Sequence, residues 1–88
     1  MWTSNIKFNP RWREELVATS NDGILIFELT MGKLHVYFPD QNCWNRQVPV
    51  WAQGKWAEYK WACESWCMQN GIPISIVNNA LVYEERQA

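Results

Sequence analysis

Three cysteines and a single histidine carry the strongest chemical potential in this chain. Cys63 and Cys67 are four residues apart, a spacing that puts both thiols on one face of a helix and suits two metal ligands. Cys43 and His35 could in principle complete a four-ligand site. Structural zinc sites usually carry two matched cysteine pairs, which this sequence lacks. We therefore expect three reduced thiols packed as small hydrophobic side chains, with no metal and no cofactor.

His35 is also the sole candidate for a general base near neutral pH. It alternates with Lys33 and Tyr37 on the polar face of an expected strand, and Glu28 falls on the preceding strand. These residues suit a small ligand-binding or enzymatic domain with a pocket between helix and sheet near His35, Glu28 and Tyr37. However, no serine, cysteine or carboxylate is tied to His35 by a motif, and a base needs a partner within hydrogen-bond reach. We expect a protein that is not an enzyme, with the pocket as the alternative.

Basic residues stand beside aromatic ones at four places: Lys7-Phe8, Arg11-Trp12-Arg13, Lys55-Trp56 and Lys60-Trp61. Aromatic platforms flanked by positive charge suit single-stranded nucleic acid, which is a further alternative. Such a binder would need a continuous positive stripe through Arg11, Arg13, Lys55 and Lys60. Glutamates lie in the same neighbourhoods and the net charge is −1, so the field for a phosphate backbone is weak. Nucleic acid is therefore a disfavoured partner.

The segment that precedes Asn70-Gly71 has helical period, and its apolar residues form two stripes. One stripe is assigned to the sheet and contains Ala52, Trp56, Tyr59, Cys63, Trp66 and Cys67. The opposite side carries Ala57, Trp61 and Met68, with Lys60 and Glu64 on a flank. A helix on one sheet needs only one apolar face, so this second stripe must be covered. We expect it to bind another protein or a second copy of the chain; the alternative cover is an N-terminal arm containing Trp2, Ile6 and Phe8.

The elements that position these residues follow from period, turn and cap signals. Residues 1–9 are expected to form an arm or edge strand. Residues 15–19 are favoured as a strand, with a helix at 10–18 as the alternative, because Asp22-Gly23 is a strong hairpin signal. Further strands are expected at residues 24–30, 33–38, 74–77 and 80–83, the last two as a hairpin. One long helix should run from about Val50 to Asn70, after a polar connection at 40–48 and before a frayed tail at 84–88.

The whole chain therefore reads as one α+β domain over residues 1–88. We expect an antiparallel sheet of about five strands in the order β-β-β-α-β-β, with the long helix packed on one face. No run of ~18 apolar residues is present, and no secretory signal is visible in the first residues of the sequence, so the expected location is the cytoplasm. The expected function is non-catalytic: a protein-binding or self-associating, dimeric domain with exposed aromatic surface. A small acidic, tryptophan-rich domain of this type would suit a phage or bacterial accessory or inhibitor-type protein.

Overall fold

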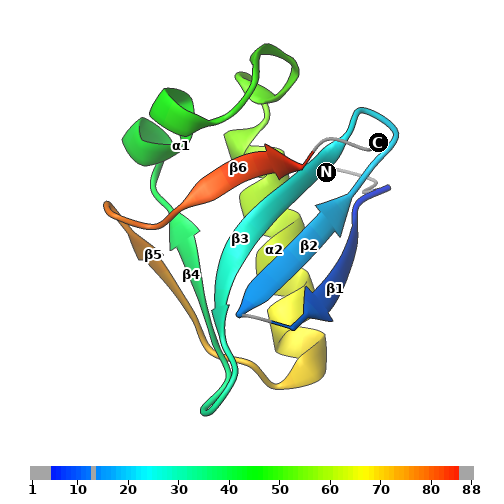
Figure 1. Ribbon diagram of the computed structural model, residues 1–88, viewed down its shortest axis with the longest axis vertical. Coiled ribbons are helices and arrows are strands. Elements are labelled where there is room, and N and C mark those ends of the chain that lie inside the picture. Colours follow the sequence, from blue (N-terminus) through cyan, green and yellow to red (C-terminus); the bar gives the residue numbers. More distant parts are fainter. Residues whose placement is uncertain (1–4, 13, 86–88) are drawn as a thin grey trace.

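The computed structural model describes residues 5–12 and 14–85 and is an α+β fold with a mixed sheet (Figure 1). Its strands and helices follow along the chain in this order: β1 (Lys7–Arg11), β2 (Glu15–Thr19), β3 (Ile24–Thr30), β4 (His35–Pro39), α1 (Gln41–Gln47), the 3₁₀ turn η1 (Val50–Ala52), α2 (Trp56–Asn70), β5 (Ile74–Val77) and β6 (Val82–Glu85).

The sheet has six strands in the order β1-β2-β3-β4-β5, with β6 paired to β3. All pairs are antiparallel except β4 with β5, so the prediction of a purely antiparallel sheet of about five strands is corrected. The parallel pair arises because α2 carries the chain back along the sheet between β4 and β5, and parallel neighbours need such a crossover.

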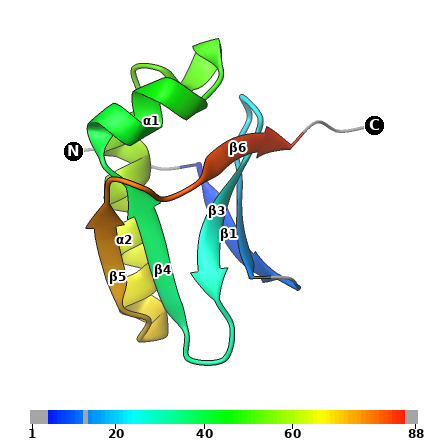
Figure 2. The same ribbon diagram turned by 60° about the vertical axis from the view of Figure 1, so that its left-hand side comes forward.

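The predicted hairpin at residues 74–83 is wrong, although both strands exist. β5 lies at the edge of the sheet beside β4, whereas β6 crosses in front of β3 and pairs with Ile24–Phe27 (Figures 1 and 2). Strand β3 therefore has β2 on one side and shares its other side between β6 and β4. Asn78-Asn79 is a turn, but it sends the chain across the fold instead of back along β5. β6 also includes Glu84 and Glu85, which were expected to fray.

The first four strands form the predicted meander. Residues 15–19 are a strand and not part of a helix, and β1 extends through Pro10 as an edge strand, where a missing N–H is tolerated. The turn at residues 20–23 is closed by the Ser20 N–H, which donates to the Gly23 carbonyl at 3.0 Å. The turn between β3 and β4 occupies residues 31–34, so β4 begins two residues later than the predicted 33–38 strand.

The long helix is shorter than predicted, and a second helix precedes it. α2 begins at Trp56 because residues 50–54 form η1 and a turn; it ends, as predicted, at Gly71 in the left-handed conformation. The expected polar connection at 40–48 contains α1, whose first turn is capped by the Asp40 carboxylate accepting from the Cys43 N–H at 2.8 Å. This cap is a signal of the kind that starts helices, and sequence reasoning missed it.

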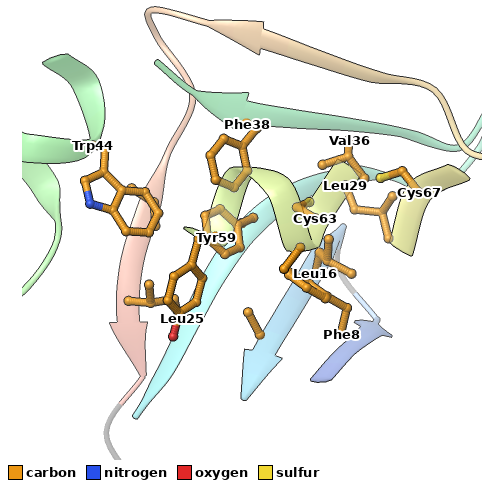
Figure 3. Close-up of a cluster of buried hydrophobic side chains, with 14 of the residues drawn as sticks. Phe8, Leu16, Leu25, Leu29, Val36, Phe38, Trp44, Tyr59, Cys63 and Cys67 are labelled. Carbon is orange, nitrogen blue, oxygen red and sulfur yellow. The ribbon is translucent and has the colours of Figure 1, made fainter. Parts of the chain in front are cut away.

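The hydrophobic core lies between α2 and the sheet, which curls around the helix so that β1 and β5 flank it (Figures 2 and 3). The predicted sheet-facing stripe is largely right: Tyr59, Cys63 and Cys67 are buried, while Trp56 and Trp66 are half-buried. Trp44 of α1 is also fully buried and joins a ring cluster with Phe27, Phe38 and Tyr59. Within the described residues, no helix has the length and apolar character that a membrane crossing requires.

Candidate interaction surface

The outer side of α2 carries the residues that the sequence singled out for binding. Met68 exposes 81% of its surface and Trp61 exposes 39%, both large values for apolar side chains on a helix. Ala57 is exposed on the same side, and Lys60 and Glu64 are half-buried on the flank. These five residues are called the α2 outer face below. The structure thus brings the predicted residues onto one surface.

An apolar groove of about 250 Å³ runs between this face and the edge strand β1. Its lining includes Trp61, Ala62 and Trp66 from α2, and Ile6 and Phe8 from the start of the chain. The rings of Phe8 and Trp66 lie 6.0 Å apart at a tilted angle, which forms the floor where strand and helix meet. Trp61 is therefore an indole at the rim of a groove rather than an isolated surface residue.

The alternative prediction, that an N-terminal arm covers the α2 outer face, can be compared with the structure at Ile6 and Phe8. Ile6 packs against the core and Phe8 is buried, so this segment belongs to the sheet side of the groove and stands beside Trp61. Trp2 lies outside the described residues. With Ile6 and Phe8 in place, Met68 and a large part of Trp61 still face outward.

The polar flank of the α2 outer face contacts residues next to the β4–β5 side of the sheet. Lys60 Nζ lies 3.2 Å from Glu64 Oε2 and 5.8 Å from the centroid of the Trp56 ring. The Trp56 indole N–H in turn donates to the Pro39 carbonyl at 3.0 Å. Because Pro39 pairs with Val77, the flank formed by Lys60 and Glu64 lies on the side of α2 that faces β4 and β5.

The alternative pocket near His35, Glu28 and Tyr37 does not lie between helix and sheet. These side chains alternate with Phe27, Leu29, Val36 and Phe38, which point into the core beneath α2, so they occupy the opposite face. The His35 ring stacks on Tyr37 with centroids 4.5 Å apart. Glu28 is engaged elsewhere: its Oε1 accepts from the Leu81 N–H at 2.7 Å, at the point where β6 and β4 diverge along β3.

His35 has one partner that sequence reasoning did not identify. Its Nε2 lies 2.8 Å from the Ser75 hydroxyl of β5, the distance expected for a serine next to a general base. Catalysis by such a pair also needs a group that orients the imidazole and donors for an oxyanion. Within the described residues, the other ring nitrogen of His35 has no hydrogen-bond partner. The pair accordingly reads as a cross-strand contact between β4 and β5.

The three cysteines are free thiols and all are buried. The Cys43 thiol donates to the Ala80 carbonyl at 3.1 Å. The hydrogen bond with Cys67, together with burial, raises the pKa of Cys63, while the same bond lowers the pKa of Cys67. Cys43 and His35 do not join the helix pair, and the described part of the chain contains no group of three or more ligands that could hold a metal ion.

The positive stripe required for binding nucleic acid is not formed, because each of its described basic residues has a carboxylate partner. Arg11 is bonded to two carboxylates, Lys55 lies 3.5 Å from Asp22 Oδ2, and Lys60 pairs with Glu64. Arg13 lies outside the described residues. Carboxylate partners cancel the field that a phosphate backbone would feel, so these side chains form local ion pairs rather than a continuous basic surface.

A polar network on the face opposite α2 was not anticipated from the sequence. Arg11 Nε donates to Glu15 Oε1 at 2.8 Å, and Arg11 Nη1 donates to Glu85 Oε2 at 2.9 Å. The Tyr83 hydroxyl donates to Glu15 Oε2 at 2.5 Å, which raises the pKa of Tyr83. Since Tyr83 pairs with Ile26 and reaches Glu15 on β2, its ring spans Ile26, which is only 1% exposed. β6 thus covers part of the sheet face opposite α2.

Comparisons with protein families, with curated proteins and with solved structures found no match to this chain.

Proposed function

We propose that this chain is a non-catalytic domain that binds another protein, or a second copy of itself, through the α2 outer face and the adjoining groove. The observation that carries the proposal is Trp61 at the rim of the groove between α2 and β1. Met68 is exposed about two helical turns further along α2. The core does not need either side chain, because Tyr59, Cys63 and Cys67 already fill the sheet-facing side of α2.

The residue types support recognition of a protein. Tryptophan and methionine are enriched at the centres of protein interfaces, whereas lysine and glutamate are typical of the rim. On α2 the apolar residues Ala57, Trp61 and Met68 form the middle of the surface, and Lys60 and Glu64 border it as an ion pair. A binding surface of this kind would serve an accessory or inhibitor-type protein of a phage or bacterium.

The test compares Trp61→Ala with Trp12→Ala. Trp12 is 82% exposed at the end of β1, so its replacement removes the same indole from a site outside the groove. We expect Trp61→Ala to weaken the complex by at least ~2 kcal/mol, as loss of a central aromatic anchor does, and Trp12→Ala to leave it unchanged. Native mass spectrometry measures self-association, and affinity capture followed by titration of the purified partner measures binding to another protein.

Denaturant melts must accompany these measurements, because Trp61 is partly packed and its removal affects the fold as well. A modest loss of unfolding free energy is compatible with the proposal provided the variant stays folded in the binding assay. Equal effects of the Trp61 and Trp12 substitutions on every complex found would remove the α2 outer face as the binding surface.

A further inference from the structure

Strand β5 leaves one of its two edges open. Its inner edge is bonded to β4: the Val36 N–H donates to the Pro73 carbonyl at 2.9 Å, and the Asp40 N–H donates to the Val77 carbonyl at 2.9 Å. Backbone groups alternate in direction along a strand, so residues 73, 75 and 77 face β4. The N–H and C=O groups of Ile74 and Ile76 therefore point to the other side, where Figures 1 and 2 show no neighbouring strand among residues 5–12 and 14–85.

The two edges of the sheet differ in chemistry. β1 carries Lys7, Pro10 and Arg11, and lysine, proline and charge are the usual devices that keep an edge strand from pairing with another chain. β5 has the sequence Ile-Ser-Ile-Val, and no charged residue or proline falls between Ile74 and Leu81. Ile76 exposes 37% of its surface at this edge. One edge is protected against strand addition, and the other has the β-branched, uncharged character that favours it.

We propose that a second copy of this chain pairs with the open edge of β5 in antiparallel orientation about a two-fold axis. This contact goes beyond the proposed function, because it lies at the β5 edge and not in the groove beside β1. With the axis at Ser75, Ile74 of each copy exchanges both backbone hydrogen bonds with Ile76 of the other, which uses all four outward groups of each strand. Ser75 then faces Ser75 of the second copy as a non-hydrogen-bonded pair, the closer of the two antiparallel pairings.

Side chains on both faces of β5 fit this register. Ile74 and Ile76 alternate with Ser75 and share the face of Val36 and Phe38, so four isoleucines would meet on the side of the helices. No charge stands in the paired segment, so two identical strands meet without repulsion. A self-complementary interface is what a two-fold axis requires, because the same patch must face itself.

The flank of α2 extends the contact beyond the strands. A pair of four-residue strands is smaller than most stable interfaces, so the dimer also needs contacts between its helices. Because the sheet curls around α2, a strand added at β5 continues along the side of the helix that carries Lys60 and Glu64 (Figure 2). A two-fold axis makes the two α2 helices antiparallel, which brings Lys60 of one copy toward Glu64 of the other. The charges are complementary, and no like charges need to meet.

The register is tested with cysteine substitutions under mild oxidation. Ser75→Cys should give a disulfide-linked dimer on a non-reducing gel, because residues in a non-hydrogen-bonded pair have Cα atoms ~4.5 Å apart, within disulfide range. Val77→Cys is the matched control: it lies on the same face of the same strand, but two residues from the axis and therefore far from its own copy. The three native cysteines are buried and should not cross-link.

The edge is tested by sedimentation or light scattering of the whole chain over a range from micromolar to millimolar concentration. We expect the parent to dimerise, and Ile76→Lys to raise the dimer dissociation constant at least about tenfold, because each lysine would lie opposite Ile74 of the other copy and the two lysines would be diagonal neighbours across the axis. Leu34→Lys is the control, since Leu34 is also an exposed aliphatic residue but lies in the turn before β4. Ile76→Pro is a second variant that replaces the side chain and removes the outward N–H without removing a hydrogen bond to β4. Circular dichroism checks that each variant is folded.

A parent that stays monomeric throughout this range would overturn the β5 pairing. So would a dimer in which Ser75→Cys does not cross-link, or one that Ile76→Lys and Ile76→Pro leave intact. If a dimer of that last kind dissociates in Trp61→Ala, the pairing fails while the proposed function stands, because self-association then uses the groove. If the parent is monomeric, the proposed function is still tested by capture with Trp61→Ala.

Discussion

Trp44 and Trp61 show how differently one residue type is used in this chain. Trp44 is fully buried in the ring cluster, and its indole N–H donates to the Ala52 carbonyl at 2.9 Å. Trp61, in contrast, contributes to the groove beside β1 and is substantially exposed. The environment, and not the residue type, therefore decides whether a tryptophan is enclosed in the core or lies at the surface.

Trp44→Ala should destabilise the fold by ~3–5 kcal/mol, the range for truncating a buried large aromatic side chain. Trp66→Ala should cost about half of this or less, because Trp66 is half-buried at the groove and has less apolar surface to lose. Urea unfolding of both variants beside the parent gives the two free energies. Equal losses for the two substitutions would contradict the burial assigned to them.

At the scale of elements, the turn between β2 and β3 is fixed by one glycine and one tryptophan. Gly23 has a φ of +155°, which side-chain-bearing residues rarely adopt. A Cβ added there would lie 2.7 Å from Cζ2 of Trp51, whose indole N–H also donates to Glu84 of β6 at 3.0 Å. The turn thus serves as a docking site for η1 as well as a connection between strands.

Gly23→Ala should destabilise the fold by about 1–3 kcal/mol through backbone strain and contact with Trp51. Gly32→Ala is the control, because a Cβ at that turn meets nothing within 4 Å. In a double-mutant cycle, Trp51→Ala should recover the part of the loss that comes from the contact and leave the backbone part. Thermal or denaturant melts of the four variants measure both parts. A cost at Gly23 no larger than at Gly32 would contradict this view of the turn.

On the scale of the whole molecule, the network of Arg11, Glu15, Tyr83 and Glu85 joins the beginning of the described chain to its end. It links β1, β2 and β6 across the face of the sheet opposite α2. The sheet therefore has α2 on one face and this polar network, with Tyr83 over Ile26, on the other. The uncharged strand β5 lies at the other edge of the sheet, away from this network.

The Arg11–Glu85 ion pair should make stability depend on pH. Donation from Arg11 lowers the pKa of Glu85, so the pair stabilises the fold above the ordinary glutamate pKa and is lost as pH falls through the lowered value. The difference in unfolding midpoint between the parent and Glu85→Gln should therefore be present at pH 7 and shrink below about pH 4. Urea melts at both pH values measure it. Glu14→Gln, which alters an exposed carboxylate outside the network, should show no comparable change.

Local patterns determined several parts of this protein from the sequence alone. The helical period placed Tyr59, Cys63 and Cys67 on the buried side of α2, and Asn70-Gly71 marked its end. Asp22-Gly23 marked the turn before β3, whose bounds match the strand predicted at residues 24–30. These features depend on neighbouring residues: a face repeats every few positions, and a positive φ favours glycine wherever the chain goes next.

Only the tertiary structure decided how the last two strands pair. The predicted strands at residues 74–77 and 80–83 are rich in β-formers and separated by Asn78-Asn79, a local pattern that fits a hairpin, yet β5 joins β4 in parallel and β6 joins β3. Closing a longer loop costs only slightly more free energy than closing a short one, so turn signals alone do not select the partner. The choice depends on surfaces that exist only after folding: the half of β3 that β4 leaves unpaired, and the Arg11 and Glu15 side chains that hold Tyr83 and Glu85.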